Sequence, residues 1–129
     1  MKSVVMCGAR RFKSEIREFA KELKAQGVFV YEPFLTNFDW AELEKQDPLI
    51  SVLVATGLTL HHIEFIRKAD VTFVYNKGGY AGNSVTLEVG AAAALHKSIY
   101  ALEHDEELCR QVLYSGEAKT PKALIGCLQ

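Results

Sequence analysis

The sequence predicts a single α/β domain over residues 1–129, built as a three-layer, Rossmann-like (flavodoxin-like) parallel sheet with helices on both faces. Short apolar, β-rich runs alternate along the chain with stretches whose apolar residues recur at helical spacing. Strands that alternate with helices pair in parallel through right-handed crossovers, which places the helices on both faces. The length of 129 residues is that of one domain.

Four strands and five helices make up this pattern. The expected strands are Ser3–Cys7, Val28–Tyr31, Val71–Tyr75 and Ser98–Leu102. The expected helices are Lys13–Gln26, a short helix from Asp39 through Leu43, Leu49–Lys68, Ser84–His96 and Asp105–Ser115. Ser14 and Asp39 are the candidate N-caps of the first two helices, and we expect Gly57 to break the third.

Composition and charge exclude several classes of protein. Apolar residues make up 49% of the chain and charged residues 24%, which is typical of a globular domain rather than a disordered or fibrous chain. The net charge of −1 provides no overall field that would attract a nucleic acid polymer or an anionic membrane. We therefore expect neither partner.

The cysteines and the N-terminus favour a cytoplasmic protein. Cys7, Cys109 and Cys127 are odd in number and form no CxxC pair, which argues against a disulfide framework and against a zinc site. No export signal is visible, and the longest mostly apolar stretch, Leu49–Leu60, is shorter than the ~20 residues that span a bilayer. We expect a soluble chain in a reducing compartment, without a metal or an organic cofactor.

Two loops are expected at the carboxyl ends of the strands, where ligands bind in such sheets. In the first, Gly8–Phe12, a glycine lets a ligand approach the backbone, and Arg10 and Arg11 stand next to the free N–H groups of a helix start. This combination favours a phosphate or carboxylate site, and the alternative is a tight turn with two solvated arginines. The loop matches neither GxGxxG nor a Walker loop, so a dinucleotide or triphosphate has little support.

The second loop, Asn76–Asn83, is rich in glycine. It contains Gly78, Gly79 and Gly82 around Tyr80, and three glycines are a costly way merely to connect a strand to a helix. We therefore expect Gly79, Tyr80, Gly82 and Asn83 to contact a ligand together with the first loop.

The helix after this loop carries a candidate catalytic carboxylate. Ser84 and Glu88 are four residues apart, so they share one face of an otherwise apolar helix. A carboxylate in such a helix is paired or functional, because burying it alone is expensive. The alternatives to catalysis are an ion pair of Glu88 with Arg10 or Arg11, or a position on the solvent face.

The adjacent histidines His61 and His62 do not form a metal motif. HExxH requires histidines at i and i+4, whereas adjacent residues of a helix point about 100° apart. The sequence offers no second ligand cluster, so we expect no metal ligands.

Three stretches of the chain carry a resemblance to a known family. They are Val5–Phe12 (VMCGARRF), Ala69–Tyr75 (ADVTFVY) and Gly82–Ala93 (GNSVTLEVGAAA) followed by Lys97–Ile99. In order and spacing they resemble the first strand and loop, the central strand and the nucleophile helix of the nucleoside 2-deoxyribosyltransferase superfamily. That superfamily includes 2′-deoxynucleoside 5′-phosphate N-hydrolases and CMP-type N-glycosidases, and the likeness runs from Val4 to about Leu102.

The resemblance implies roles for individual residues. Glu88 matches the nucleophile that attacks the anomeric carbon of the sugar. Gly8 and Arg11 match loop positions that hold the sugar and, in nucleotide hydrolases, the 5′-phosphate. Ser84 lies in the helix-opening segment that contacts the sugar or the phosphate. Small members commonly form dimers in which the neighbouring subunit helps to close the pocket.

Three positions depart from the family pattern. His62 and Gly82 stand where the family often has aspartates, and Ala9 stands where nucleotide hydrolases often have a serine. The leaving base needs a proton, and His62, whose ordinary pKa is near ~6.5, is the candidate to supply it. The alternative for His62 is a position on the helix surface.

Two functions from different classes follow. The first is cleavage or transfer of the N-glycosidic bond of a nucleoside or nucleoside 5′-monophosphate by a glutamate nucleophile, as an N-glycosidase or a deoxyribosyltransferase. The second is a non-catalytic nucleotide-binding module of the same fold. We also expect a homodimer or higher homo-oligomer, and the expected interface comprises Leu49–Leu60, Phe34, Phe38 and Trp40. The alternative is that these residues fill the core of their own chain.

Overall fold

A five-stranded, fully parallel sheet is the centre of the computed structural model, which describes residues 1–34 and 40–129, the side chain of Trp40 excepted. The strands are β1 (Val4–Gly8), β2 (Val30–Tyr31), β3 (Val71–Tyr75), β4 (Ser98–Ala101) and β5 (Gly116–Glu117), in the order β2-β1-β3-β4-β5. The helices are α1 (Lys13–Ala25), α2 (Trp40–Gln46), α3 (Pro48–Lys68), α4 (Asn83–Ala94), α5 (Leu108–Gln111) and α6 (Pro121–Cys127), with 3₁₀ turns η1 (Arg10–Phe12) and η2 (Lys77–Gly79).

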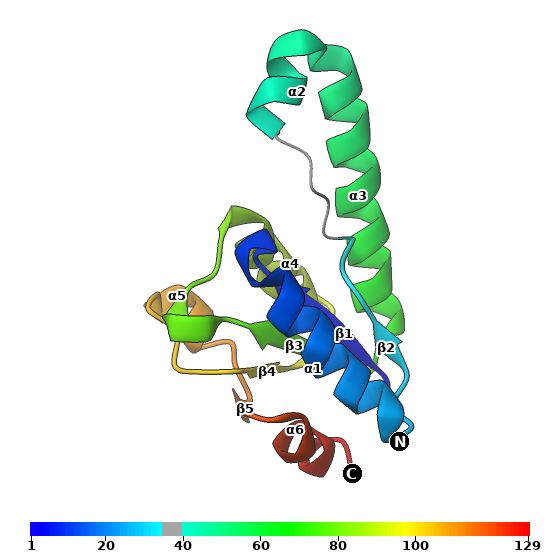
Figure 1. The fold of residues 1–129 in the computed structure, drawn as a ribbon. Helices are drawn as coiled ribbons and strands as arrows, with labels where there is room; N and C mark the ends of the chain where they lie inside the picture. The colour runs from blue at the N-terminus through cyan, green and yellow to red at the C-terminus, as the bar shows by residue number, and fades with distance from the viewer. Residues whose placement is uncertain (35–39) are drawn as a thin grey trace.

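Helices cover both faces of this sheet, which confirms the predicted three-layer α/β class (Figure 1). On one face, α1 and α6 bury an apolar cluster in which Phe19 stacks on Phe73, with ring centroids 4.7 Å apart. On the other face, α3 and α4 bury a second cluster that includes Ile66, Val85 and Val89. β1 contributes to both clusters, because successive side chains of a strand point to opposite faces.

The strand order reverses between β1 and β3. These two strands pair in register over five residues, from Val4 with Val71 to Gly8 with Tyr75. β2 lies on the other side of β1, so the crossovers that leave β1 and β3 run to opposite sides of the sheet. In such sheets a crevice opens beyond the carboxyl ends of the strands at this switch point.

α3 is one uninterrupted helix, so the predicted break near Gly57 is wrong. The Asp47 side chain caps it by accepting a hydrogen bond from the Ile50 N–H at 3.1 Å. Gly57 is exposed, and a Cβ at this position would meet no atom within 4 Å. A glycine inside a helix costs about 1 kcal/mol relative to alanine, too little to end a helix whose other residues continue the pattern.

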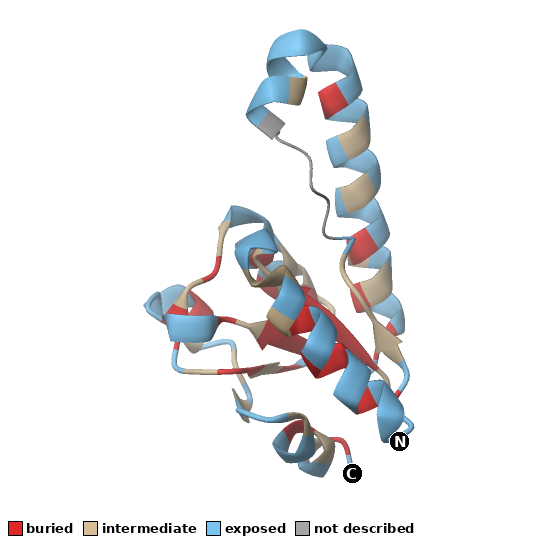
Figure 2. Cartoon of the chain, viewed as in Figure 1, coloured by how far each residue is buried: buried red, intermediate tan, exposed pale blue. Residues whose placement is uncertain are grey.

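α2 and the N-terminal half of α3 extend away from the sheet, and most of their residues are exposed (Figure 2). By length and composition α3 is long and apolar enough to cross a membrane, with a mean hydropathy of 1.6 over a window of which 17% is buried. The predicted helix over Leu49–Lys68 is confirmed, with a start one residue earlier at Pro48. Its C-terminal part packs on the sheet through Ile66.

The segment after β4 differs most from its prediction. In place of a helix over Asp105–Ser115, the structure has the short α5, then β5 and α6, neither of which was predicted. The chain here folds around the buried Asp105 carboxylate, to which the Arg110 and Tyr114 side chains donate hydrogen bonds. A usable signal for α6 was present in the sequence, because Thr120 caps the helix and Pro121 follows at its first position.

The remaining elements are confirmed with small shifts at their ends. Ser14 is not the cap of α1, because the helix continues from η1 and Phe12 occupies the N-cap position without a side-chain hydrogen bond. α4 ends at Ala94, and His96 beyond it has a φ of 58°, a left-handed conformation that cannot continue the helix. Phe38, the Asp39 cap and the side chain of Trp40 lie outside the described residues.

Candidate active site

A cavity of about 480 Å³ opens at the carboxyl end of β1, where the loop after β1, the start of α4 and one side of α3 meet. Its lining comprises Gly8, Ala9 and Arg10 of the first loop; Gly82, Asn83, Ser84, Val85 and Glu88 at the start of α4; and a wall of Pro33, Phe34, Ala55, Leu58, Thr59, His61 and His62. This edge of the sheet is where the sequence predicts ligand binding.

Three polar side chains from three elements converge beside this cavity: Cys7 on β1, His62 on α3 and Glu88 on α4. His62 Nε2 lies 3.3 Å from Cys7 Sγ and 3.6 Å from Glu88 Oε2. Cys7 is fully buried, and the side chains of His62 and Glu88 are 8% and 18% exposed. Because His62 is buried, the alternative of a surface histidine is wrong.

Burial controls the protonation of these three groups. Desolvation raises the pKa of Glu88 to about 7, and a hydrogen bond with Cys7 lowers it only in part. Desolvation lowers the pKa of His62 to about 4, with a further contribution from His61. Burial raises the pKa of the Cys7 thiol well above its ordinary value, and Glu88 adds to this shift. At neutral pH the thiol and the imidazole are therefore uncharged, and Glu88 is the group that titrates.

Seven of the predicted site residues line the cavity: Gly8, Arg10, His62, Gly82, Asn83, Ser84 and Glu88. Glu88 is not on the solvent face of α4, since its side chain points among Cys7 and His62. At Gly8 a Cβ would lie 2.4 Å from Ile16 Cδ1, so any larger residue would require the end of the Ile16 side chain to move.

The other three predicted residues, Arg11, Gly79 and Tyr80, are not part of the lining. The Arg11 guanidinium carbon lies 3.7 Å from the centroid of the Tyr80 ring, a cation–π contact. Gly79 has a φ of +81°, and a Cβ there would lie 2.8 Å from the His104 carbonyl oxygen. The close packing of this loop on residues 103–106 accounts for the glycine at position 79.

Sequence reasoning missed the apolar wall of the cavity and the contact between Cys7 and His62. Phe34, Ala55 and Leu58 belong to the patch predicted for self-association, yet all three line the cavity. The position of Cys7 at a strand end beside the first loop could have drawn attention to it. Nothing in the sequence indicated that Cys7 contacts His62.

The converging cluster also contains donor types that bind metal ions. The Sγ of Cys7, a ring nitrogen of His62 and a carboxylate oxygen of Glu88 all lie within 4.8 Å of one another. A thiolate, an imidazole and a carboxylate are the three side-chain ligand types of zinc.

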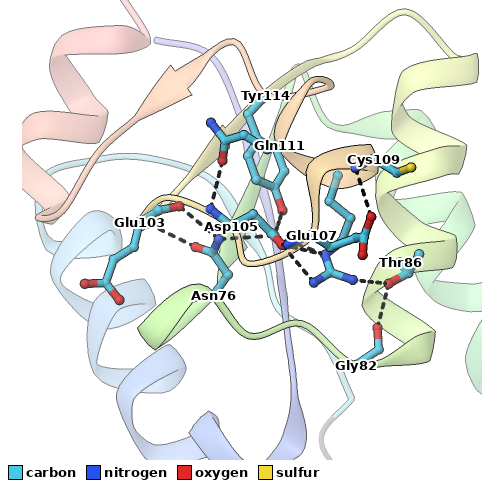
Figure 3. A network of polar contacts seen from close by, with 10 residues as sticks. Asn76, Gly82, Thr86, Glu103, Asp105, Glu107, Cys109, Gln111 and Tyr114 are labelled. Atoms are coloured by element: carbon cyan, nitrogen blue, oxygen red, sulfur yellow. Dashed lines mark hydrogen bonds and ion pairs between the residues drawn. The ribbon is translucent and has the colours of Figure 1, made fainter.

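A buried polar network holds the start of α4 against the segment after β4 (Figure 3). Arg110 Nε donates to both carboxylate oxygens of Asp105 at 3.0 Å, and the Tyr114 hydroxyl donates to the same carboxylate at 2.5 Å. Arg110 Nη1 donates to Thr86 Oγ1 at 3.1 Å, and that hydroxyl donates to the Gly82 carbonyl at 2.9 Å. The guanidinium therefore links Asp105 to the first turn of α4, where the cavity residues lie.

Comparison with known proteins was made for the whole chain. No protein-family model matches it, and no curated protein matches it. Among solved structures, the chain is similar to the CMP N-glycosidase BcmB of Clostridium botulinum, with a TM-score of 0.56 and 17% sequence identity over 98% of each chain.

This likeness shows that the two chains share a fold, a three-layer α/β architecture around a parallel sheet. The resemblance found in the sequence agrees with this likeness at the level of the fold.

Replacing Asp105 tests whether the network supports the site. We expect Asp105→Asn to lower the free energy of unfolding by about 3–5 kcal/mol at pH 7, because it leaves the buried Arg110 guanidinium without its counter-ion. The exposed N-cap variant Asp47→Asn is the matched control, since asparagine caps as well as aspartate. Urea denaturation measures the free energy of unfolding of both variants. A decrease below about 1 kcal/mol for Asp105→Asn would contradict the role of Asp105 as the buried counter-ion of Arg110.

The pH dependence of this effect has a definite sign. Burial alone would raise the pKa of Asp105, but hydrogen bonds from Arg110, Tyr114 and the Glu107 N–H outweigh it and hold the pKa below its ordinary value. The stability that this carboxylate contributes is present above its ordinary pKa of about 3.9 and is lost as the pH falls through the lowered value. The difference in the free energy of unfolding between the wild type and Asp105→Asn should therefore become smaller in acid.

Proposed function

We propose that this protein cleaves or transfers the N-glycosidic bond of a nucleoside or nucleoside 5′-monophosphate, with Glu88 as the nucleophile. The observation that carries this proposal is a partly buried carboxylate on the wall of a 480 Å³ cavity at the switch point of the sheet. The similar protein BcmB is by its name a CMP N-glycosidase, so cytidine 5′-monophosphate is the first substrate to test.

The chemistry needs a carboxylate in such surroundings. Breaking an N-glycosidic bond builds positive charge on the sugar, and a carboxylate next to the anomeric carbon stabilises that charge, as in retaining glycosidases. Attack by a Glu88 oxygen forms a glycosyl ester as the bond to the base breaks, and water or a second base then takes the sugar. The low polarity around Glu88 strengthens its attraction for the developing cation.

His62 is the second catalytic residue of the proposal. Because its pKa is about 4, it enters the reaction as a neutral imidazole and not as an imidazolium. Its Nε2 lies 3.6 Å from Glu88 Oε2, longer than a hydrogen bond, and because His62 also lines the cavity it can donate a hydrogen bond to the leaving base. The apolar wall of Phe34, Ala55 and Leu58 offers a surface for the flat face of the base.

Substitution of Glu88 is the direct test of this function. Glu88→Gln keeps the shape of the side chain and removes the nucleophile, so base release should fall at least about a thousandfold while the fold is kept. Chromatographic detection of free base and circular dichroism measure the two. Glu64→Gln, which changes an exposed glutamate of α3, is the matched control and should leave the rate unchanged.

The alternative of a non-catalytic binding module has its own outcome. Calorimetry that shows saturable binding of nucleotides, together with no free base from any nucleoside or monophosphate at high enzyme load, would favour it. It would overturn the enzymatic proposal and leave the cavity as a binding site.

The position of Arg10 favours a binding site for a 5′-phosphate at one end of the cavity. Arg10 and Ser84 line it, and the first N–H groups of α4 face the same region, because no side chain caps this helix. Arg11 stacks on Tyr80 instead.

The two neighbouring arginines therefore provide a test and its control. Arg10→Ala should reduce kcat/KM about ten- to a hundredfold for the monophosphate and leave the nucleoside rate unchanged, since a charge-assisted contact contributes roughly 1.5–3 kcal/mol. Arg11→Ala should affect both substrates little. If Arg10→Ala lowers kcat/KM equally for the nucleoside and the monophosphate, Arg10 is not part of a phosphate-binding site.

Self-association through α3 belongs to the same proposal. Leu49, Leu53, Thr56, Leu60 and Ile63 follow one another at spacings of four, three, four and three residues, the heptad spacing of a helix–helix seam. The three leucines are 59–68% exposed in the single chain. Burying them in an interface would stabilise it by about 1.5–3 kcal/mol each. A second copy of the chain, presenting the same seam, is the occupant that fits this spacing.

Two leucine substitutions test the seam. The wild type should sediment as a dimer or larger assembly, and the double variant Leu53→Glu/Leu60→Glu should sediment as a monomer. The matched control is Leu108→Glu on α5, which changes an equally exposed leucine of 72% away from α3. A wild type that is monomeric at all concentrations, or one that floats with lipid vesicles, would overturn the seam.

A further inference from the structure

The cluster of Cys7, His62 and Glu88 carries an inference beyond the proposed reaction. These three ligand types come from β1, α3 and α4, which are far apart in the chain. For that reason they form no local metal-binding motif such as CxxC or HExxH in the sequence. Among the described residues, they are the group in which three such donor atoms lie within 4.8 Å.

The distances within the cluster match those of a tetrahedral zinc site. With Zn–S near 2.3 Å and Zn–N and Zn–O near 2.0–2.2 Å, ligand atoms around zinc are about 3.3–3.6 Å apart. The two measured edges are 3.3 Å, from Cys7 Sγ to His62 Nε2, and 3.6 Å, from His62 Nε2 to Glu88 Oε2. The third edge, from Cys7 Sγ to a Glu88 carboxylate oxygen, is no longer than 4.8 Å.

The imidazole is suitably oriented for such a site. Nε2 is the nitrogen that faces both Cys7 and Glu88, while the buried Nδ1 has no hydrogen-bond partner in the described part of the chain. A ligating histidine carries its proton on the nitrogen that does not bind the metal. His62 and Glu88 also line the cavity, so a fourth position can be filled by water or by an oxygen of a bound molecule.

We propose that Cys7, His62 and Glu88 form a binding site for a thiophilic divalent cation of the zinc class, with its fourth position open to the cavity. On binding, the S–H bond of Cys7 breaks and its proton passes to solvent as the metal–sulfur bond forms. The His62 Nε2 lone pair and a Glu88 carboxylate oxygen complete the protein ligands.

Occupation of this site has a functional consequence that rests on the proposed function. A Glu88 oxygen bound to the metal is not available to attack a sugar, and the cation repels the positive charge that develops there. The metal should therefore inhibit base release, and its removal should restore it.

Cobalt(II) is the probe for the binding arm, because thiolate coordination gives a near-ultraviolet charge-transfer band that other ligands do not. The full-length chain is treated with chelator, dialysed and titrated with Co²⁺, and Zn²⁺ is then added to displace it. We expect a one-to-one complex with the thiolate band, and weaker zinc binding by roughly a hundredfold or more in Cys7→Ala, since losing even a residue that only orients a ligand costs about 10–100-fold.

Two further variants keep the test decisive. Cys109→Ser removes an exposed thiol and should leave the band and the zinc affinity unchanged. If Cys7→Ala fails to fold, His62→Gln should weaken binding while retaining the thiolate. Absence of a one-to-one complex, cobalt binding without the band, or a band that survives Cys7→Ala would each overturn the site.

The activity arm is separate from the binding arm. Saturating Zn²⁺ should abolish base release from cytidine 5′-monophosphate, and excess chelator should restore it. If the chain releases no base under any condition, the proposed function fails, while the cobalt spectra still decide the metal site. If base release is unaffected by zinc that the spectra show to be bound, the inhibitory assignment is wrong.

Discussion

The parallel pairing of β1 with β3 is the interaction on which the rest of the structure depends. The two strands are in register over five residues, from Val4 with Val71 to Gly8 with Tyr75. Because both strands are buried, this register decides which of their side chains meet α1 and which meet α3 and α4. The same pairing ends at the switch point, so the loop after Gly8 opens onto the cavity and Cys7 lies beside it.

The parts of the fold that could be predicted from the sequence are those with local signals. The apolar run of β3, the helical spacing of α1 and the glycines that follow both strands of the central pair each specify an element without reference to its neighbours. Glu88 could be singled out for a similar reason, since a carboxylate in an apolar helix conflicts with its surroundings and such conflicts concentrate at functional sites.

What the sequence could not show is set by contacts between distant elements. Cys7 and His62 are 55 residues apart, and the rotation of α3 about its axis decides whether His61 or His62 faces the sheet. Adjacent helical residues differ by about 100°, and α3 is too uniformly apolar for its pattern to fix that rotation. Likewise, the amphipathic pattern of Asp105–Ser115 favours a helix until Asp105 is seen to be the buried partner of Arg110.

The burial of Glu88 connects the proposed reaction with the proposed metal site. A carboxylate with a purely structural role would be matched by a cation, which would lower its pKa, whereas burial raises the pKa of Glu88 and its neighbours Cys7 and His62 are uncharged at neutral pH. An apolar side chain at this position of α4 would make the folded chain more stable. Positive charge that enters the cavity would offset the free-energy cost of burying Glu88. A sugar that develops positive charge in a transition state supplies it briefly, and a divalent cation supplies it permanently, so the same desolvated carboxylate favours both and lets them compete for one position.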